Sequence, residues 1–140
     1  GDAAHATVPF YGQGMNAGFE DCRILDELLD RHEDNFKTCF HEYSKVRKPN
    51  ADGVQDLSMQ NFVVMRDKTA DPKFLLQKEI ENKFANLYPN KWTPLYSMVS
   101  FTNTPYAEAW KIGMKQEKLM QSIMSTPNIL PSADIGTTSP

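Results

Sequence analysis

The sequence lacks a surplus of positive charge. Its 140 residues carry 15 Lys and Arg against 18 Asp and Glu, which gives a net charge of −3. A domain that binds duplex nucleic acid usually has a clear excess of basic residues, because contacts to phosphates dominate that binding. The composition therefore argues against a nucleic-acid partner, and the acidic excess is too small to indicate a disordered acidic tail.

Cysteines and long apolar runs are also scarce. Cys22 and Cys39 stand 17 residues apart and form neither a CxxC pair nor a disulfide framework, so a reducing cytosolic compartment is the default expectation. The apolar runs are only a few residues long, against the roughly 18 that a membrane-spanning helix needs. No signal peptide is visible, but the chain starts at Gly1 inside a motif, so this says nothing about the parent protein.

Most of the chain has the periodicity of amphipathic helices. The predicted helices cover residues 14–31, 34–47, 51–69, 72–88 and 105–125. Pro49 is read as the stop signal of the second helix. Residues 89–104 contain two prolines and an apolar cluster, and they are expected to form an extended buried segment. The fold class is therefore mainly α, with about five helices, one extended segment, and a disordered tail over residues 126–140.

The first 16 residues combine a carboxylate, a proline and closely spaced glycines, a pattern that a loop connecting two elements does not require. Asp2 and Pro9 precede Gly12-Gln13-Gly14, which stands at the mouth of the first predicted helix. Glycine lets the backbone approach a ligand, and the unpaired N–H groups of a helix start favour a ligand that becomes anionic. An ionised Asp2 can accept hydrogen bonds from a polyol. The pattern suits a reduced flavin, although a glycine turn that only caps an ordinary helix explains the same residues.

The stretch GDAAHATVPFYGQGMNAGFEDC (1–22) resembles the second FAD-binding motif, and the helix after it, of the FAD-dependent aromatic hydroxylases built like p-hydroxybenzoate hydroxylase. Three further stretches resemble the branch of that family that hydroxylates L-kynurenine: DLSMQNFVVMR (56–66), FLLQKEIENKF (74–84) and PLYSMVSFTNTPYAEA (94–109). The resemblance covers residues 1 to about 120. It implies a C-terminal fragment of an enzyme of tryptophan degradation that uses FAD, NADPH and molecular oxygen.

The resemblance also implies roles for single residues. Asp2 would bind ribityl or ribose hydroxyls of FAD, and the helix start at Gly14, Met15 and Asn16 would meet the pyrimidine edge of the flavin. The flavin, rather than a side chain, would carry out the oxygen chemistry, so no catalytic residue and no metal ligand is expected.

For the substrate, the resemblance assigns the amino-acid end of kynurenine to Asn61 and Tyr96. The residues expected near its ring and the flavin are Pro9, Phe10, Gln13 and Met65. Asn61 is polar on an otherwise apolar helical stripe, where a buried amide needs partners. A hydrogen bond between two helices would explain Asn61 equally well, and Tyr96 could be a core aromatic with a satisfied hydroxyl.

The parent enzyme implied by the resemblance has an α/β Rossmann-type FAD domain. Residues 1–31 would end that domain, and residues 32–125 would form a helical region that contributes to the substrate pocket. The GxGxxG fingerprint and the arginine expected to pair with the kynurenine carboxylate would lie in the missing N-terminal half, so this piece alone is expected to be inactive.

The sequence leaves more than one possibility for the cellular location and for the function. Residues 107–140 lack the hydrophobic anchor of the mitochondrial-membrane forms, which favours a soluble cytoplasmic enzyme of bacterial type, or a mitochondrial outer-membrane one whose anchor is missing. A related flavin hydroxylase with another substrate and a helical interaction module without catalysis both remain open.

Overall fold

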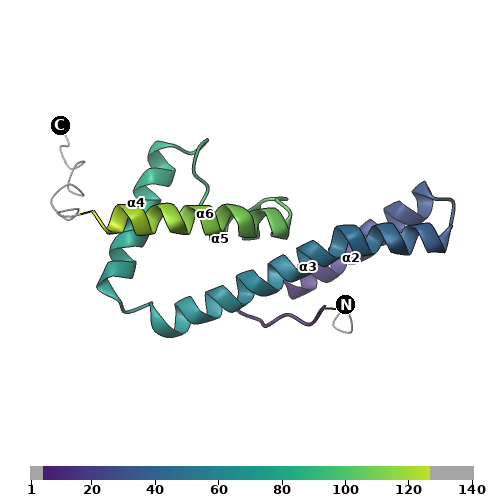
Figure 1. The fold of residues 1–140 in the computed structure, drawn as a ribbon, viewed down its shortest axis with the longest axis horizontal. Coiled ribbons are helices and arrows are strands. Elements are labelled where there is room, and N and C mark those ends of the chain that lie inside the picture. The colour runs from purple at the N-terminus through teal and green to yellow at the C-terminus, as the bar shows by residue number, and fades with distance from the viewer. Residues whose placement is uncertain (1–4, 127–140) are drawn as a thin grey trace.

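Helices joined by short loops make up the part of the chain that the computed structural model describes, residues 5–126 (Figure 1). In chain order they are α2 (Gly14–Arg31), α3 (Phe36–Asp67), α4 (Pro72–Leu87), α5 (Leu95–Phe101) and α6 (Tyr106–Met124). No strand occurs among these residues, so the mainly α fold class is confirmed. Apart from Thr126, the tail predicted from residue 126 onward lies outside the described part.

Helices α2 and α3 form an antiparallel hairpin (Figure 1). The chain reverses at Glu33 and Asp34, whose φ angles of 49° and 60° are in the left-handed region. Asn35 then caps α3, because its side chain accepts a hydrogen bond from the Thr38 backbone N–H. Near the turn, the buried Cys39 thiol donates to the Leu28 carbonyl at 3.2 Å.

Helix α6 begins against the middle of α3, and α4 and α5 pack on α6. The core between these helices contains Leu57, Met98, Val99 and Ala109. Gly53 allows the close approach: a Cβ atom on it would lie 2.8 Å from the Ala107 backbone nitrogen. Beside it, the Ala107 N–H donates to the Asn50 side chain at 3.1 Å, so the contact supplies a partner for one N–H of the first turn of α6.

The break predicted at Pro49 is wrong, because α3 runs unbroken through this residue. An interior proline removes one helical hydrogen bond and costs about 3 kcal/mol in an isolated helix. Here tertiary contacts hold the helix on both sides of the proline. Arg47 is bonded to α2 on one side, and Gly53 is packed on α6 on the other. Packing therefore overrides the local stop signal.

The extended segment predicted over 89–104 is also wrong in its central part, which forms α5. Pro94 precedes this short helix, and its carbonyl accepts the Met98 N–H at 2.9 Å. A helix of seven residues makes only about two turns. It buries only two side chains, Met98 and Val99, so its sequence repeats the helical pattern too few times to be recognised. Proline at the helix start is compatible with α-helix because its missing N–H would have no intrahelical partner there.

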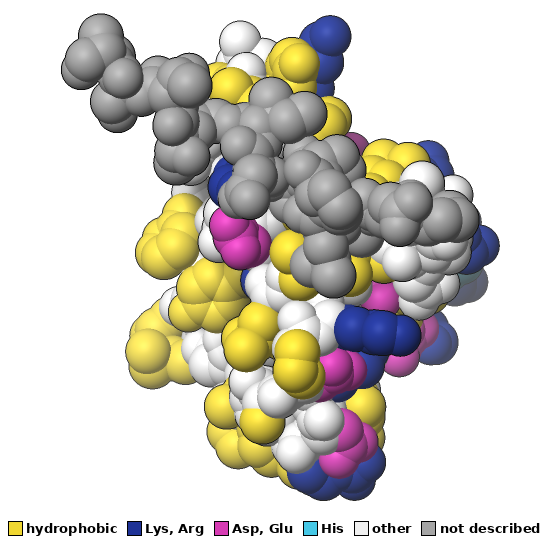
Figure 2. All heavy atoms as spheres, turned by 90° about the vertical axis from the view of Figure 1, so that its left-hand side faces the viewer, with side chains coloured by type: hydrophobic (Ala, Val, Ile, Leu, Met, Phe, Trp, Pro, Cys, Tyr) yellow, Lys and Arg dark blue, Asp and Glu magenta, His cyan; other side chains and the backbone are white. Residues whose placement is uncertain are grey.

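The described helices do not cover all of their apolar surface. Figure 2, a view onto the side of the molecule where α4 lies, shows hydrophobic side chains gathered along one edge. The most exposed large apolar side chains are Met15, Phe19, Leu87 and Phe101, each about 70% exposed or more. Contiguous exposed apolar surface marks places where a protein contacts something else. None of the helices described is both long and apolar enough to cross a membrane.

Candidate functional site

The glycine turn and the start of α2 form the first part of the site. The Gly12 N–H donates to the Pro9 carbonyl at 3.2 Å, and Gly12 has a φ of +68°, which favours glycine. The first intrahelical bond runs from the Ala17 N–H to the Gln13 carbonyl. Because Gly14, Met15 and Asn16 precede that bond, their N–H groups have no partner within the helix, and the Gln13 side chain does not cap them.

A cavity of about 630 Å³ lies against this helix start. Its wall includes Gly12, Gly14, Gly18 and the side chains of Met15 and Phe19. A Cβ atom on Gly12 or Gly18 would meet no atom within 4 Å, so the wall is open at both positions. An open wall next to unpaired N–H groups fits a flat ring with carbonyl acceptors along one edge, as in a flavin. Asp2, the other expected cofactor ligand, lies outside the described residues.

Gln13 and Asn16 contact each other instead of facing separate ligands. The buried Gln13 Oε1 accepts hydrogen bonds from Asn16 Nδ2 at 2.9 Å and from the Tyr106 hydroxyl at 3.2 Å. Burial raises the pKa of Tyr106, and the nearby Glu20 raises it further, so this phenol stays a donor. Gln13 therefore ties the start of α2 to α6. Gln13, Asn16 and Tyr106 also line a separate cavity of about 750 Å³.

Asn61 and Tyr96 line one cavity, of about 430 Å³, together with Tyr11. Asn61 comes from α3 and Tyr96 from α5, so the fold brings together side chains 35 positions apart. The Tyr11 ring stacks on the Tyr96 ring with centroids 5.8 Å apart. Burial, with a smaller contribution from Tyr96, raises the pKa of Tyr11 to about 12. The cavity therefore presents two phenol rings beside a carboxamide, and the Tyr11 phenol stays neutral.

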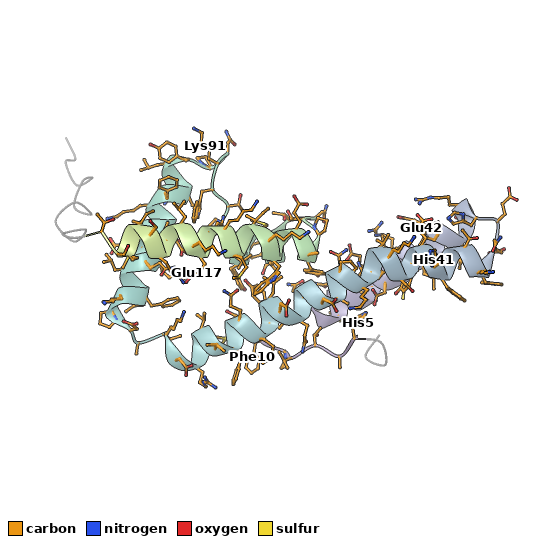
Figure 3. The ribbon with its side chains drawn as sticks, viewed as in Figure 1. His5, Phe10, His41, Glu42, Lys91 and Glu117 are labelled. Atoms are coloured by element: carbon orange, nitrogen blue, oxygen red, sulfur yellow. The ribbon has the colours of Figure 1, made fainter. Side chains whose placement is uncertain are left out.

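The contacts of Asn61 fix the orientation of its side-chain amide. Its Nδ2 donates to the Phe10 carbonyl at 2.6 Å and lies 3.7 Å from the Met65 sulfur. A carbonyl only accepts hydrogen bonds, so the nitrogen has to face Phe10, which leaves Oδ1 as the atom that can accept from a ligand. The Phe10 ring packs on Phe62 at 4.5 Å, and this segment lies along α3 (Figure 3).

The residues assigned to the substrate are thus only partly together. Asn61 and Tyr96 share a cavity, and Phe10 and Met65 contact Asn61. Pro9 instead lines the cavity of about 630 Å³ at the start of α2, and Gln13 lines the separate cavity of about 750 Å³.

Tyr11 was missed, although its place between Phe10 and Gly12 was a signal for it. The prediction rested on Gly12 and Gly14 and left out Tyr11, the aromatic residue directly before Gly12. Its stacking partner, Tyr96, is far away in the sequence, so that contact could not be read from the local pattern.

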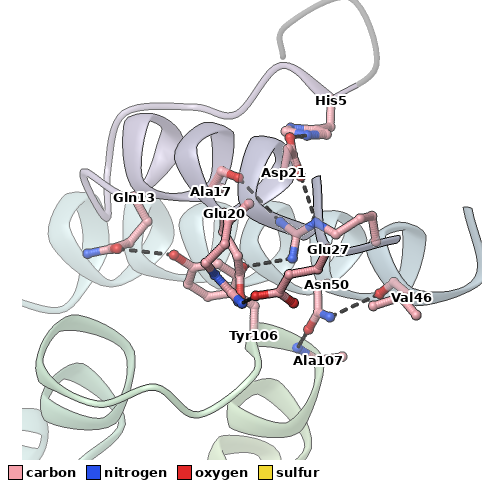
Figure 4. Close-up of polar contacts among 12 residues, drawn as sticks. His5, Gln13, Ala17, Glu20, Asp21, Glu27, Val46, Asn50, Tyr106 and Ala107 are labelled. Atoms are coloured by element: carbon pink, nitrogen blue, oxygen red, sulfur yellow. Dashed lines mark hydrogen bonds and ion pairs between the residues drawn. The ribbon is translucent and has the colours of Figure 1, made fainter. Parts of the chain in front are cut away.

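A buried ionic network beside the site was missed as well (Figure 4). Arg47 of α3 is 3% exposed. It donates to Asp21 Oδ1 at 2.6 Å, to Glu20 Oε2 at 2.7 Å and to the Ala17 carbonyl at 3.3 Å. The second Asp21 oxygen is bonded to His5. Burial alone would raise the pKa of Asp21, but the hydrogen bonds from Arg47 and His5 outweigh it and lower that pKa.

Residues 5–126 contain no group of three or more His, Cys, Asp or Glu side chains placed to hold a metal ion. His41 and Glu42, which follow Cys39 along α3, lie near the far end of the hairpin (Figure 3). Glu42 is bonded there to Arg31 and His32.

No family model matches the sequence. Individual proteins do match it. It is 57% identical over 129 residues to kynurenine 3-monooxygenase from Flavobacterium psychrophilum and 54% identical over 129 residues to the enzyme of that name from Christiangramia forsetii. Each match covers 92% of this chain and 29% of the relative. The enzyme of that name from Sus scrofa is 45% identical over 124 residues, or 89% of this chain and 26% of the relative. The chain thus spans less than a third of the length of these curated relatives.

Proposed function

We propose that this chain, which is homologous to kynurenine 3-monooxygenases over 92% of its length, is part of an enzyme that hydroxylates L-kynurenine to 3-hydroxykynurenine. The enzyme would use FAD, NADPH and molecular oxygen. The observation that carries the proposal is the cavity shared by Asn61, Tyr96 and Tyr11, next to a glycine turn and an uncapped helix start. Bound FAD supplies the oxygen chemistry, and this part of the protein binds and orients.

The helix start is the proposed contact for the flavin. The N–H groups of Gly14, Met15 and Asn16 would donate to the carbonyl edge of the ring and stabilise negative charge on it. The open wall at Gly12 and Gly18 leaves room for a flat ring. Asp2 is proposed to accept hydrogen bonds from hydroxyl groups of FAD, as an ionised carboxylate can.

The amino-acid end of kynurenine is proposed to lie between Asn61 and Tyr96. Asn61 Oδ1 can accept from the ammonium group, because Nδ2 is already bonded to the Phe10 carbonyl. The Tyr96 hydroxyl can donate to the carboxylate. Tyr11 would support the Tyr96 ring by stacking on it, since the two centroids are 5.8 Å apart.

The rest of the relatives' length, more than two thirds of it, would complete this site. A cavity wall that is open at Gly12 and Gly18, and large apolar side chains left exposed on α2 and α5, are what a piece of a larger enzyme would show. We therefore expect the isolated piece to be inactive, so the full-length enzyme is the form in which the proposed site can be tested.

Removal of the Tyr96 hydroxyl is the test of the proposed substrate contact. Tyr96→Phe should raise KM for kynurenine about tenfold, because one hydrogen bond to a charged group is lost. Tyr88→Phe is the matched control, because it also removes a phenol hydroxyl, and Tyr88 caps the C-terminal end of α4 and does not line the cavity. Asn61→Ala should raise KM at least as much, with Asn90→Ala as its control.

Three outcomes would count against the proposal. Wild-type KM in both the Tyr96 and the Asn61 variants would remove the proposed substrate site. An equal rise in KM for Tyr88→Phe would show that the effect is not local. A full-length enzyme that binds FAD but leaves kynurenine unchanged would refute the proposal that kynurenine is the substrate. The proposal that FAD is the cofactor would stand.

A further inference from the structure

The loop of residues 5–13 is fastened at two points, directly to helix α3 at one and to helix α2 at the other. Near its end, the Phe10 carbonyl accepts a hydrogen bond from Asn61. At its beginning, His5 is bonded to Asp21, and Asp21 is held by Arg47 of α3 (Figure 4). The glycine turn follows these two contacts and leads directly into α2. The position of the loop therefore determines the direction in which the first N–H groups of α2 point.

The fastening at His5 is buried and stiff. The side chains of His5, Asp21 and Arg47 are 14%, 6% and 4% exposed. Arg47 also bonds Glu20 and the Ala17 carbonyl, so its guanidinium is fixed to α2 at three places. Because charged groups inside a protein are screened little by water, these contacts hold their geometry more strongly than surface ion pairs do.

His5 is the member of this network that belongs to the loop. It also lines the 630 Å³ cavity at the start of α2, together with Thr7, Pro9 and Gly12 of the same loop. Loss of its contact with Asp21 would release this wall of the cavity and leave the Arg47–Asp21 pair intact. The effect would therefore fall on the cavity more than on the helix pair.

We propose that His5 is a positioning residue of the cofactor site: through Asp21 and Arg47 it fixes the loop so that the glycine turn and the start of α2 face FAD. This inference rests on the proposed FAD-dependent function. Its physical content is that one hydrogen bond, made by a side chain in the cavity wall to Asp21 of α2, sets the affinity for the cofactor. Helix α3 carries both Arg47 and Asn61, so the same fastening also sets the loop relative to the substrate cavity.

Two substitutions of His5 in the full-length enzyme test this role. His5→Phe keeps a planar ring and removes the hydrogen bond to Asp21. His5→Gln keeps a donor that can reach the carboxylate. The dissociation constant for FAD, measured by titrating the apoprotein with FAD, should rise about tenfold in His5→Phe and stay near wild type in His5→Gln.

A second readout separates positioning from lost protein. The ratio of hydroxylated kynurenine to NADPH consumed does not depend on how much enzyme is folded. It should fall in His5→Phe, because a displaced loop shifts the flavin relative to the substrate, and it should recover in His5→Gln.

The control is His32→Phe, which breaks another His–carboxylate contact on the same hairpin. His32 bonds Glu42 at 2.7 Å, and Figure 3 places Glu42 near the end of the hairpin far from the glycine turn. This variant should bind FAD as tightly as wild type, even if its melting temperature is lower.

The proposal is overturned if His5→Phe binds FAD as tightly as wild type. It is also overturned if His5→Gln fails to restore binding, or if His32→Phe weakens FAD binding equally. If the wild-type enzyme binds FAD but hydroxylates a different aromatic compound, the proposed substrate is wrong, and the FAD comparison still decides the role of His5.

Discussion

Gly53 is the residue at which a single added methyl group should separate two helices. A Cβ atom there would lie 2.8 Å from the Ala107 nitrogen, 2.9 Å from the Tyr106 carbonyl carbon and 3.0 Å from the Ala107 Cα. All three are backbone atoms at the start of α6, so no side-chain rotation relieves the overlap. Gly53→Ala should therefore push α6 away from α3 and strain the hydrogen bond from Ala107 to Asn50.

The expected magnitude is a difference between two opposing effects. Replacing a glycine inside a helix by alanine favours the helix by roughly 1 kcal/mol. Overpacking a tight contact costs about 1–3 kcal/mol. Gly18→Ala gives the first effect alone, because a Cβ atom there meets nothing within 4 Å. The stabilities of the two variants should therefore differ by about 1–3 kcal/mol, with Gly53→Ala the weaker.

Thermal melting of the full-length apoprotein measures this difference, and the absence of FAD keeps the cavity wall at Gly18 out of the comparison. Gly113→Ala should fall between the two, because its Cβ would meet only the end of the flexible Leu95 side chain, at 2.6 Å. Equal melting temperatures for Gly53→Ala and Gly18→Ala would refute the close helix contact. A fall with Gly113→Ala as large as with Gly53→Ala would refute the distinction between backbone and side-chain neighbours.

Two further predictions concern Tyr11 and Pro49. Burial raises the pKa of Tyr11 from 10.0 to about 12, so its contribution to stability is complete below pH 10 and is lost as the pH rises through about 12. Tyr11→Phe should flatten the fall in melting temperature above pH 10, and an unchanged profile would contradict the burial of this phenol. Pro49→Ala restores an N–H inside α3 and should raise the free energy of unfolding by about 2 kcal/mol, measured by denaturant unfolding. A loss of stability in that variant would mean that the exposed proline ring packs in the full-length enzyme.

Long amphipathic stretches made most of the helices predictable from the sequence. The helix expected over residues 14–31 matches α2, and those expected over 72–88 and 105–125 match α4 and α6 within a residue or two. Each of them has enough turns for an apolar stripe to stand out, and α2 begins directly after its glycine turn. Pro72 and Pro105 stand at or before a helix start, where proline fits.

The error at Pro49 comes from contacts across the fold, whereas the error in α5 comes from the shortness of that helix. A proline signals a local stop, but the contacts that keep α3 helical come from α2 and α6, which local sequence cannot show. The same contrast between local pattern and distant contacts holds for the residues of the site. Asn61 stood out because it is polar on an apolar stripe, whereas the stacking of Tyr11 on Tyr96 and the burial of Arg47 depend on residues distant in the sequence.

The correction at Pro49 changes how the proposed site works. Two helices divided at Pro49 would carry Arg47 and Asn61 on separate elements, which could shift relative to each other. One continuous α3 carries both, 14 positions apart; it bonds the loop directly at Phe10, and it reaches His5 through Asp21 of α2. At 1.5 Å of rise per residue, that spacing is roughly 21 Å along a single helix axis. We infer that α3 fixes the distance between the proposed cofactor and substrate cavities. Substitutions near Arg47 should therefore affect FAD binding, and substitutions near Asn61 should affect kynurenine binding.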